Sequence, residues 1–199
     1  MNLKVGDRES GPGQPCYIVA EVGLAHDGSL GQAHAYVEEC ARLGADAVKF
    51  QCHDGDPTSE WRVPPVWPQD RNREDYWKRT GFKGWDWLGL KEHCYRRDVM
   101  FLCSPFSLEA VASMDHLVPA WKIPSGRITD AAMLDAVSAT GKPAILSTGM
   151  ATEEEISLFA FGWDSVMNVW ICNDSAAMEG HSQFGARLGP MSGIAPAVL

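Results

Sequence analysis

This chain of 199 residues lacks the features of several protein classes. It has no run of about 18 apolar residues, the length that a membrane-spanning helix requires, and its first ten residues hold no apolar segment typical of a secretory signal. No basic run occurs, and the formal net charge is −9, so a phosphate backbone is a poor partner. We therefore expect a cytoplasmic protein that binds neither a membrane nor nucleic acid.

Paired cysteine motifs are also missing. No Cys-x-x-Cys pair occurs among the six cysteines, which are Cys16, Cys40, Cys52, Cys94, Cys103 and Cys172. The ligand spacing of a metal cluster is therefore absent, and we expect free thiols in a reducing compartment. The nucleotide-binding patterns G-x-G-x-x-G and G-x-x-x-x-G-K-[ST] do not occur either.

Short β-rich runs alternate with amphipathic helical runs along the chain, which is 45% hydrophobic and can bury a core as one domain, residues 1–199. Strands are predicted at 16–21, 46–52, 99–103, 120–124, 144–147 and 166–172. Helices are predicted after the capping residues Ser29, Ser107, Asp130 and Thr152, and near residues 86–97. This alternation predicts a parallel sheet with helices outside.

Five of the eight tryptophans lie between positions 61 and 87, where prolines also gather. We predict a long, proline-stiffened loop there rather than a helix or a strand. Its aromatic faces could contact a ligand, or the tryptophans could pack on one another.

Polar residues lie at or just beyond the ends of five successive predicted strands. They are Glu21, Lys49, Gln51, Ser104, Lys122, Ser125 and Ser147. Strand ends that all face one mouth are typical of a TIM barrel, whereas a doubly wound sheet gathers its ligands at one switch point. The sequence therefore predicts an α/β fold of the TIM (β/α)8-barrel type, incomplete, with about six of the eight β/α units.

Two of these residues, Lys49 and Lys122, are lysines within short apolar strands. A buried, unpaired ammonium would cost several kcal/mol, so each needs an anionic partner. Three interpretations are open: a structural ion pair with Glu21 or an aspartate, a clamp on a phosphate or carboxylate ligand, or a Schiff-base lysine. The hydroxyls and glycines at the same strand ends favour the anion clamp.

Glu21 and His26 are the candidate catalytic residues. Glu21 could be no more than the partner of Lys49, or it could act as a general acid or base. His26 lies in the following loop, GLAHDG, where a histidine is either a surface residue or part of the site.

Five strings occur in a characteristic order: AEVGLAHDGS, GADAVKFQ, FLCSPF, WKIPSG and GKPAILSTGMAT. Together they resemble the N-acetylneuraminate (sialic acid) synthase family, strongly over residues 5–156 and more weakly to residue 172. The resemblance implies a condensation of phosphoenolpyruvate with the open-chain aldehyde of an N-acetylated aminosugar. It also implies a divalent metal cofactor, manganese or magnesium, and a homodimer for a full-length parent.

The resemblance also assigns roles to single residues. Glu21 matches a catalytic carboxylate, and the tryptophan-rich segment matches the variable region over the sugar pocket. Phosphoenolpyruvate would bind at Lys49, Gln51, Ser104, Lys122, Ser125 and Ser147.

Several positions depart from the family pattern. Ala25 precedes His26 where the family has asparagine, and Arg127 stands where it has an acidic residue. The strings with the metal-binding histidines, the last two barrel strands and the C-terminal antifreeze-like domain do not occur before Leu199. Three functions are therefore open: a synthase of the sialic-acid type, a non-catalytic truncated remnant that binds phosphoenolpyruvate weakly without turnover, or another phosphoenolpyruvate aldol-type synthase or Schiff-base aldolase on the same barrel.

Overall fold

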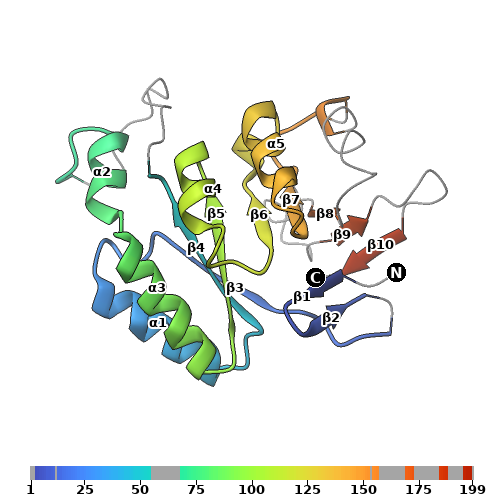
Figure 1. Cartoon of the computed structure of the whole chain (residues 1–199), viewed down its shortest axis with the longest axis horizontal. Coiled ribbons are helices and arrows are strands. Elements are labelled where there is room, and N and C mark those ends of the chain that lie inside the picture. Colours follow the sequence, from blue (N-terminus) through green and yellow to red (C-terminus); the bar gives the residue numbers. More distant parts are fainter. Residues whose placement is uncertain are drawn as a thin grey trace. The chain divides into compact units, whose positions relative to one another are not determined.

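The computed structural model describes residues 3–11, 13–54, 68–152, 154–156, 169–172, 184–187 and 195–198. The chain divides into two compact units, and Figure 1 labels the helices and strands of both. Residues 19–118 form one unit, and residues 1–18 together with 119–199 form the other. That the whole chain is one domain stays a prediction.

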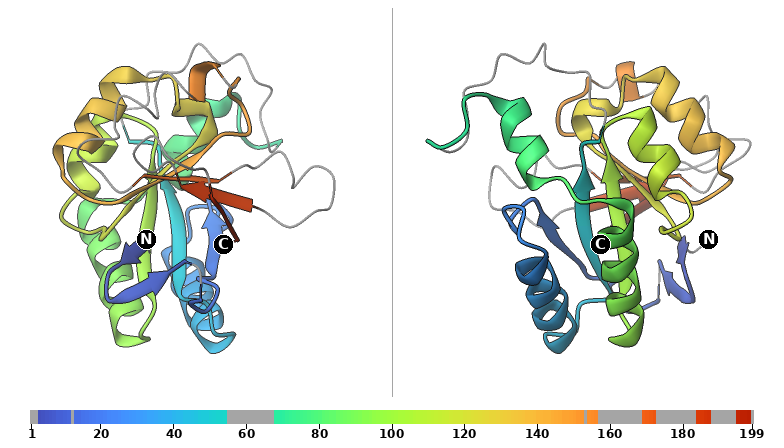
Figure 2. Two further views of the ribbon diagram at one scale, coloured as in Figure 1. Left: turned by 90° about the vertical axis from the view of Figure 1, so that its right-hand side faces the viewer. Right: turned by 60° about the vertical axis from the view of Figure 1, so that its left-hand side comes forward.

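The unit of residues 19–118 is a parallel sheet with helices. Its strands are β3 (Val19–Gly23), β4 (Ala47–Cys52) and β5 (Met100–Pro105), and β4 pairs in parallel with both neighbours. Its helices are α1 (Leu30–Arg42), α2 (Arg73–Thr80), α3 (Gly84–Arg96) and α4 (Leu108–Met114). Helices α1 and α3 lie side by side in both views of Figure 2 and contact each other and the sheet.

Two of these helices, α1 and α4, begin at predicted capping residues. The Ser29 hydroxyl accepts a hydrogen bond from the Gln32 N–H at 3.2 Å, and the Ser107 hydroxyl accepts one from Ala110 at 2.9 Å. Gly44 stops α1 with a φ of +83°, a conformation that glycine adopts without strain. The predicted helix starts at Ser29 and Ser107 are therefore confirmed.

The two faces of the sheet differ because side chains alternate along a strand. On one face Phe50 is fully buried, and its ring lies 6.1 Å from that of Trp87 on α3 and 5.9 Å from that of Phe101. Lys49 and Gln51 alternate with these apolar residues and so belong to the other face. The apolar face forms the core with the helices, and the polar face carries Lys49 and Gln51, two of the candidate site residues.

Helix α2 corrects the prediction of a continuous loop in the tryptophan-rich segment. The Asn72 side chain caps it by accepting from the Asp75 N–H at 2.8 Å, and acidic residues at its start and basic residues at its end suit the helix dipole. Only Tyr76 and Thr80 of α2 are buried, so its apolar periodicity is too weak to recognise in the sequence. Most of the prolines of the segment, and Trp61 and Trp67, lie outside the described residues.

The other unit has two sheets. A hairpin of β1 (Leu3–Val5) and β2 (Arg8–Ser10) turns at Gly6, which has a φ of +59°. Strands β6 (Trp121–Ile123), β7 (Ala144–Ser147) and β8 (Val169–Cys172) are parallel, and β9 (Phe184–Arg187) and β10 (Ala195–Val198) continue the sheet antiparallel. Helix α5 (Ala131–Ala139) follows its predicted cap, Asp130, and buries Met133, Leu134 and Val137.

All six predicted strands are present, and within each unit the three of them run parallel. The hairpin and the two strands β9 and β10 were not predicted. The Gly-Asp turn of the hairpin is a recognisable signal, whereas FGAR and APAV are too short and too mixed to predict strands.

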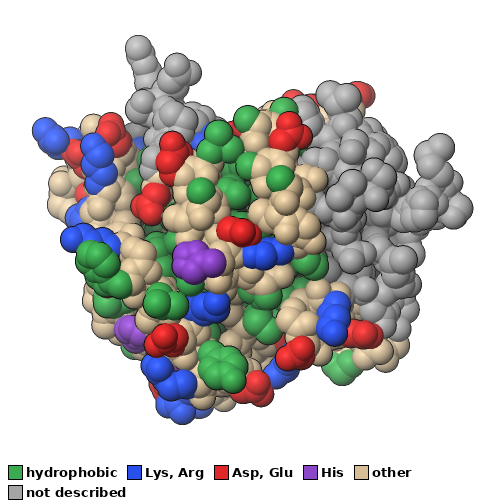
Figure 3. Space-filling model, viewed as in Figure 1, with side chains coloured by type: hydrophobic (Ala, Val, Ile, Leu, Met, Phe, Trp, Pro, Cys, Tyr) green, Lys and Arg blue, Asp and Glu red, His purple; other side chains and the backbone are tan. Residues whose placement is uncertain are grey.

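No helix in the described ranges is long and apolar enough to cross a membrane. On the face shown in Figure 3, acidic and basic side chains are interspersed over the helices, a mixture typical of a solvated surface.

Candidate anion-binding site

The polar face of the sheet of β3, β4 and β5 brings together four of the predicted site residues. Glu21 is paired in register with Lys49, and Gln51 with Ser104. Residues in register on neighbouring parallel strands point to the same side, and positions 49 and 51 are two apart, so all four share one face. Glu21 lies within β3 rather than at its end, which corrects the sequence reading by two residues.

Lys49 is the buried centre of this group. Its ammonium pairs with the Glu21 carboxylate and donates a hydrogen bond to the Ser104 hydroxyl at 3.2 Å. The Lys49 side chain is 9% exposed, whereas that of Glu21 is 48% exposed. The expected anionic partner is therefore found, and it is the member of the pair that an incoming ligand can reach.

A second lysine–serine pair lies in the other unit. The Lys122 ammonium bonds to the Ser147 hydroxyl at the end of β7, and Ser147 and Thr148 are both buried. Ser125 lies on the short 3-10 helix η2 (Ser125–Arg127) directly after β6. The approach of Lys49 and Lys122 to one ligand stays a prediction.

His26 is a fully buried residue, not a surface one. Its ring stacks on Phe82 with 4.4 Å between the centroids, and its Nδ1 accepts a hydrogen bond from the Gly28 N–H at 3.2 Å. A neutral ring that accepts at Nδ1 carries its proton on Nε2, and within the described residues this buried Nε2 has no hydrogen-bond partner. Burial lowers the pKa of His26 to about 4, although Asp27 opposes the shift.

We expect the free energy of unfolding to fall when the pH is lowered from 7 to 4. His26 takes up a proton near pH 6.5 in the unfolded chain but only near pH 4 in the folded one. The contribution of neutral His26 to the free energy of unfolding is complete above pH 6.5 and falls by on the order of 3 kcal/mol towards pH 4, since one pKa unit corresponds to about 1.4 kcal/mol. Urea unfolding at pH 7, 5.5 and 4 measures it. The variant His26→Phe should flatten the profile; an unchanged profile would contradict the role of His26.

The loop that carries His26 is clamped by α2. The Arg79 guanidinium donates to Asp27 Oδ1 at 2.7 Å and makes two bonds of 2.9 Å to the carboxylate of Asp70. Gly28 lies so close to this helix that a methyl group on it would be 2.3 Å from the Arg79 carbonyl oxygen. The close approach requires glycine at position 28, and the His26 loop is therefore held by residues that the sequence does not mark as a site.

The tryptophans of the segment fall into different environments. Trp87 is buried in the core, whereas Trp85 is 70% exposed, with the Lys83 ammonium 5.2 Å from its ring centroid. Trp77 stacks on His53 with 4.7 Å between the ring centroids. Packing therefore accounts for Trp87 and Trp77.

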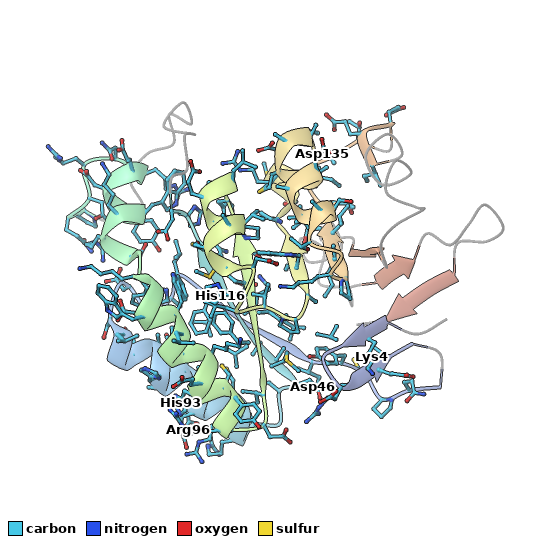
Figure 4. The ribbon with its side chains drawn as sticks, in the orientation of Figure 1. Lys4, Asp46, His93, Arg96, His116 and Asp135 are labelled. Carbon is cyan, nitrogen blue, oxygen red and sulfur yellow. The ribbon has the colours of Figure 1, made fainter. Side chains whose placement is uncertain are left out.

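A histidine cluster away from the candidate site joins α1 to α3. His34 Nδ1 and His93 Nδ1 are 2.9 Å apart, and Glu38 contacts His93 Nε2 at 3.3 Å and the Arg97 guanidinium. Figure 4 labels His93 on α3. Burial lowers the pKa of His34, and His93 and then Arg96 add to the shift. Its partners are more than 50 residues distant in the sequence, so sequence reading missed the cluster.

The structure offers no ligand set for the expected divalent metal in the part of the chain it describes. No group of three or more His, Cys, Asp or Glu side chains could hold a metal ion there. Within the same ranges, Cys16, Cys40, Cys52, Cys94 and Cys103 are free thiols, as predicted.

Comparison with known proteins identifies relatives of this chain. The model of the NeuB family matches residues 36–164. An N,N'-diacetyllegionaminic acid synthase of Campylobacter jejuni is 35% identical over 169 residues, covering 81% of this chain and 48% of that protein. A pseudaminic acid synthase of Helicobacter pylori is 31% identical over 151 residues, covering 72% of this chain and 44% of that protein.

A solved structure shows the same architecture. The N-acetylneuraminic acid (sialic acid) synthetase of Leptospira borgpetersenii, crystallised with citrate, superimposes with a TM-score of 0.69 at 27% identity, over 82% of this chain and 55% of that one. The predicted α/β fold of the barrel type is thereby confirmed. The chain spans about half the length of these relatives. Because the family model covers more than half of the chain, and the C. jejuni synthase is similar over most of it, this chain belongs to the NeuB family.

Proposed function

We propose that the protein takes part in a condensation of phosphoenolpyruvate with an N-acetylated aminosugar that yields a nonulosonate of the sialic-acid type. The observation that carries this proposal is the buried Lys49 ammonium, held on the polar sheet face between Glu21 and Ser104. A fixed positive charge with hydroxyl donors suits the phosphate and carboxylate of phosphoenolpyruvate. Relatives that make legionaminic and pseudaminic acids support the class of product.

In the proposed reaction, C3 of phosphoenolpyruvate attacks the aldehyde carbon of the open-chain sugar, and a new C–C bond forms. The former aldehyde oxygen takes up a proton and becomes a hydroxyl, while water adds to the cationic C2 and loses a proton. Phosphate then leaves by cleavage of the C2–O bond, and C2 becomes a ketone. Lys49, Gln51 and Ser104 from one unit, and Lys122, Ser125 and Ser147 from the other, would hold the anionic groups. Their role is to orient phosphoenolpyruvate and to stabilise the charge that phosphate carries away.

Proton transfer is assigned to Glu21. It is the half-exposed member of the ion pair with Lys49, so its carboxylate can reach a substrate while the buried ammonium fixes its position. His26 remains the second catalytic candidate of the proposal. The proton-bearing Nε2 of His26 is buried, and its ring stacks on Phe82. A substrate would have to reach this nitrogen before His26 could transfer a proton to it.

The test combines binding and turnover. Calorimetric titration of the chain with phosphoenolpyruvate should give saturable binding, and inorganic phosphate should compete. Phosphate release is then followed by ³¹P NMR with phosphoenolpyruvate, manganese and N-acetylmannosamine, or the N-acetylated precursor sugars of legionaminic and pseudaminic acid. Release that requires both substrates is the expected result for a synthase.

Each alternative has its own outcome in these assays. Binding without phosphate release, with every sugar, would favour the non-catalytic protein. A lysine that becomes alkylated when borohydride is added with a carbonyl substrate would favour the Schiff-base aldolase. Absence of phosphoenolpyruvate binding would overturn the proposed function.

A further inference from the structure

His53 lies directly after β4, two residues beyond Gln51, with its ring between two aromatic rings. The centroid of Phe106 is 3.9 Å from that of His53 at an interplanar angle of 21°, and that of Trp77 is 4.7 Å away at 10°. Phe106 is itself tied to β4, because its N–H donates to the Cys52 carbonyl oxygen at 3.0 Å. Stacking on both faces fixes the plane of the imidazole, which therefore presents its edge in a set direction.

That edge contacts the side-chain amide of Gln51. His53 Nε2 lies 3.2 Å from Gln51 Oε1. With the amide oxygen facing the ring, as in this structure, His53 donates from Nε2. With the NH₂ group facing the ring, neutral His53 would accept at Nε2 and carry its proton on Nδ1. The tautomer of His53 and the orientation of Gln51 therefore determine each other.

The NH₂ group of Gln51 consequently points away from His53 and towards Gly23. A methyl group added at Gly23 would be 3.3 Å from Gln51 Nε2 and 3.0 Å from Glu21 Oε1. The amide donor and the Glu21 carboxylate thus end over the same glycine, on the sheet face that also carries Lys49. This is the position from which an N–H donor can reach an anion held beside the lysine.

We propose that His53 is a positioning residue, which aims the amide donor of Gln51 at the anionic substrate. The proposal rests on the proposed function, because the anion is phosphoenolpyruvate. An anion is attracted by the NH₂ end of the amide and repelled by its oxygen, so the wrong orientation would replace a hydrogen bond with a repulsion. Trp77, from the tryptophan-rich segment, contributes to the site by holding His53 in place.

The decisive experiment is a double-mutant cycle on the 199-residue chain, with phosphoenolpyruvate affinity measured by calorimetry. His53→Phe keeps an aromatic ring in the stack and removes the hydrogen-bond donor, and Gln51→Ala removes its target. We expect His53→Phe to weaken binding roughly three- to tenfold, the range for one lost hydrogen bond. In the Gln51→Ala background the same change should have no further effect. His116→Phe, at an exposed histidine of the same unit, is the matched control and should bind normally.

The outcomes separate this proposal from the proposed function. Additive effects of His53→Phe and Gln51→Ala, or unchanged affinity of His53→Phe, would show that His53 does not act through Gln51. A ¹⁵N NMR spectrum that places the proton of neutral His53 on Nδ1 would overturn the proposal whether or not phosphoenolpyruvate binds. If the unaltered chain fails to bind phosphoenolpyruvate, the proposed function fails, and the role of His53 towards this substrate fails with it. A loss of thermal stability in His53→Phe, together with weaker binding by His116→Phe, would also contradict the proposal, because it would indicate a general effect on the fold.

Discussion

Replacing Lys49 with methionine is expected to weaken phosphoenolpyruvate binding on the order of 100-fold or more, the range for loss of a buried charged contact. The folded state should tolerate the change. Methionine fills a similar volume among buried neighbours and removes the cost of burying an ammonium. Glu21 would lose its partner, but its side chain is 48% exposed and can be hydrated instead.

Calorimetry gives the affinity, and urea unfolding tests that the variant is folded. Lys78→Met is the matched control in the same unit, because the Lys78 ammonium pairs with Glu74 on the surface of α2 and its side chain is 70% exposed. The control should bind phosphoenolpyruvate as the unaltered chain does. Equal affinities of Lys49→Met and Lys78→Met would mean that Lys49 only forms a structural ion pair with Glu21 and does not bind the anionic ligand.

Replacing Gly28 with alanine is expected to lower the free energy of unfolding by about 3 kcal/mol, through backbone strain and overpacking together. Gly28 has a φ of +82°, which disfavours any side chain, and the new methyl group would lie 2.3 Å from the Arg79 carbonyl oxygen. Helix α2 cannot retreat easily, because Arg79 is bonded to both Asp70 and Asp27. The loop that carries His26 would have to move instead.

Gly44→Ala separates the two causes. Gly44 has nearly the same φ, +83°, but nothing lies within 4 Å of a methyl group placed there. Its substitution should cost only about 1 kcal/mol, the strain of the left-handed conformation. Urea unfolding of both variants measures the difference. Equal losses would show that α2 and the His26 loop are not in contact as the structure has them.

Local patterns in the sequence determined the framework of this protein. The apolar β-rich runs predicted all six parallel strands, and Ser29, Ser107 and Asp130 marked helix starts correctly because a cap is a contact between residues three apart. The polar residues at the strand ends also predicted that Lys49, Gln51 and Ser104 lie together. The register of β4 and β5 pairs Gln51 with Ser104, and Lys49 is two residues before Gln51, so the three side chains share one face of the sheet.

Tertiary structure alone decided how these residues are held. Sequence left open whether Lys49 pairs with Glu21, whether His26 is buried, and what the tryptophans do, because each depends on partners far along the chain. His26 is buried by Phe82, and His53 is fixed by Trp77 and Phe106. Helix α2 has little apolar periodicity of its own and is held in place by the bonds of Arg79 to Asp27 and Asp70. Burial and stacking are properties of contacts between distant segments, and such contacts exist only once the chain has folded.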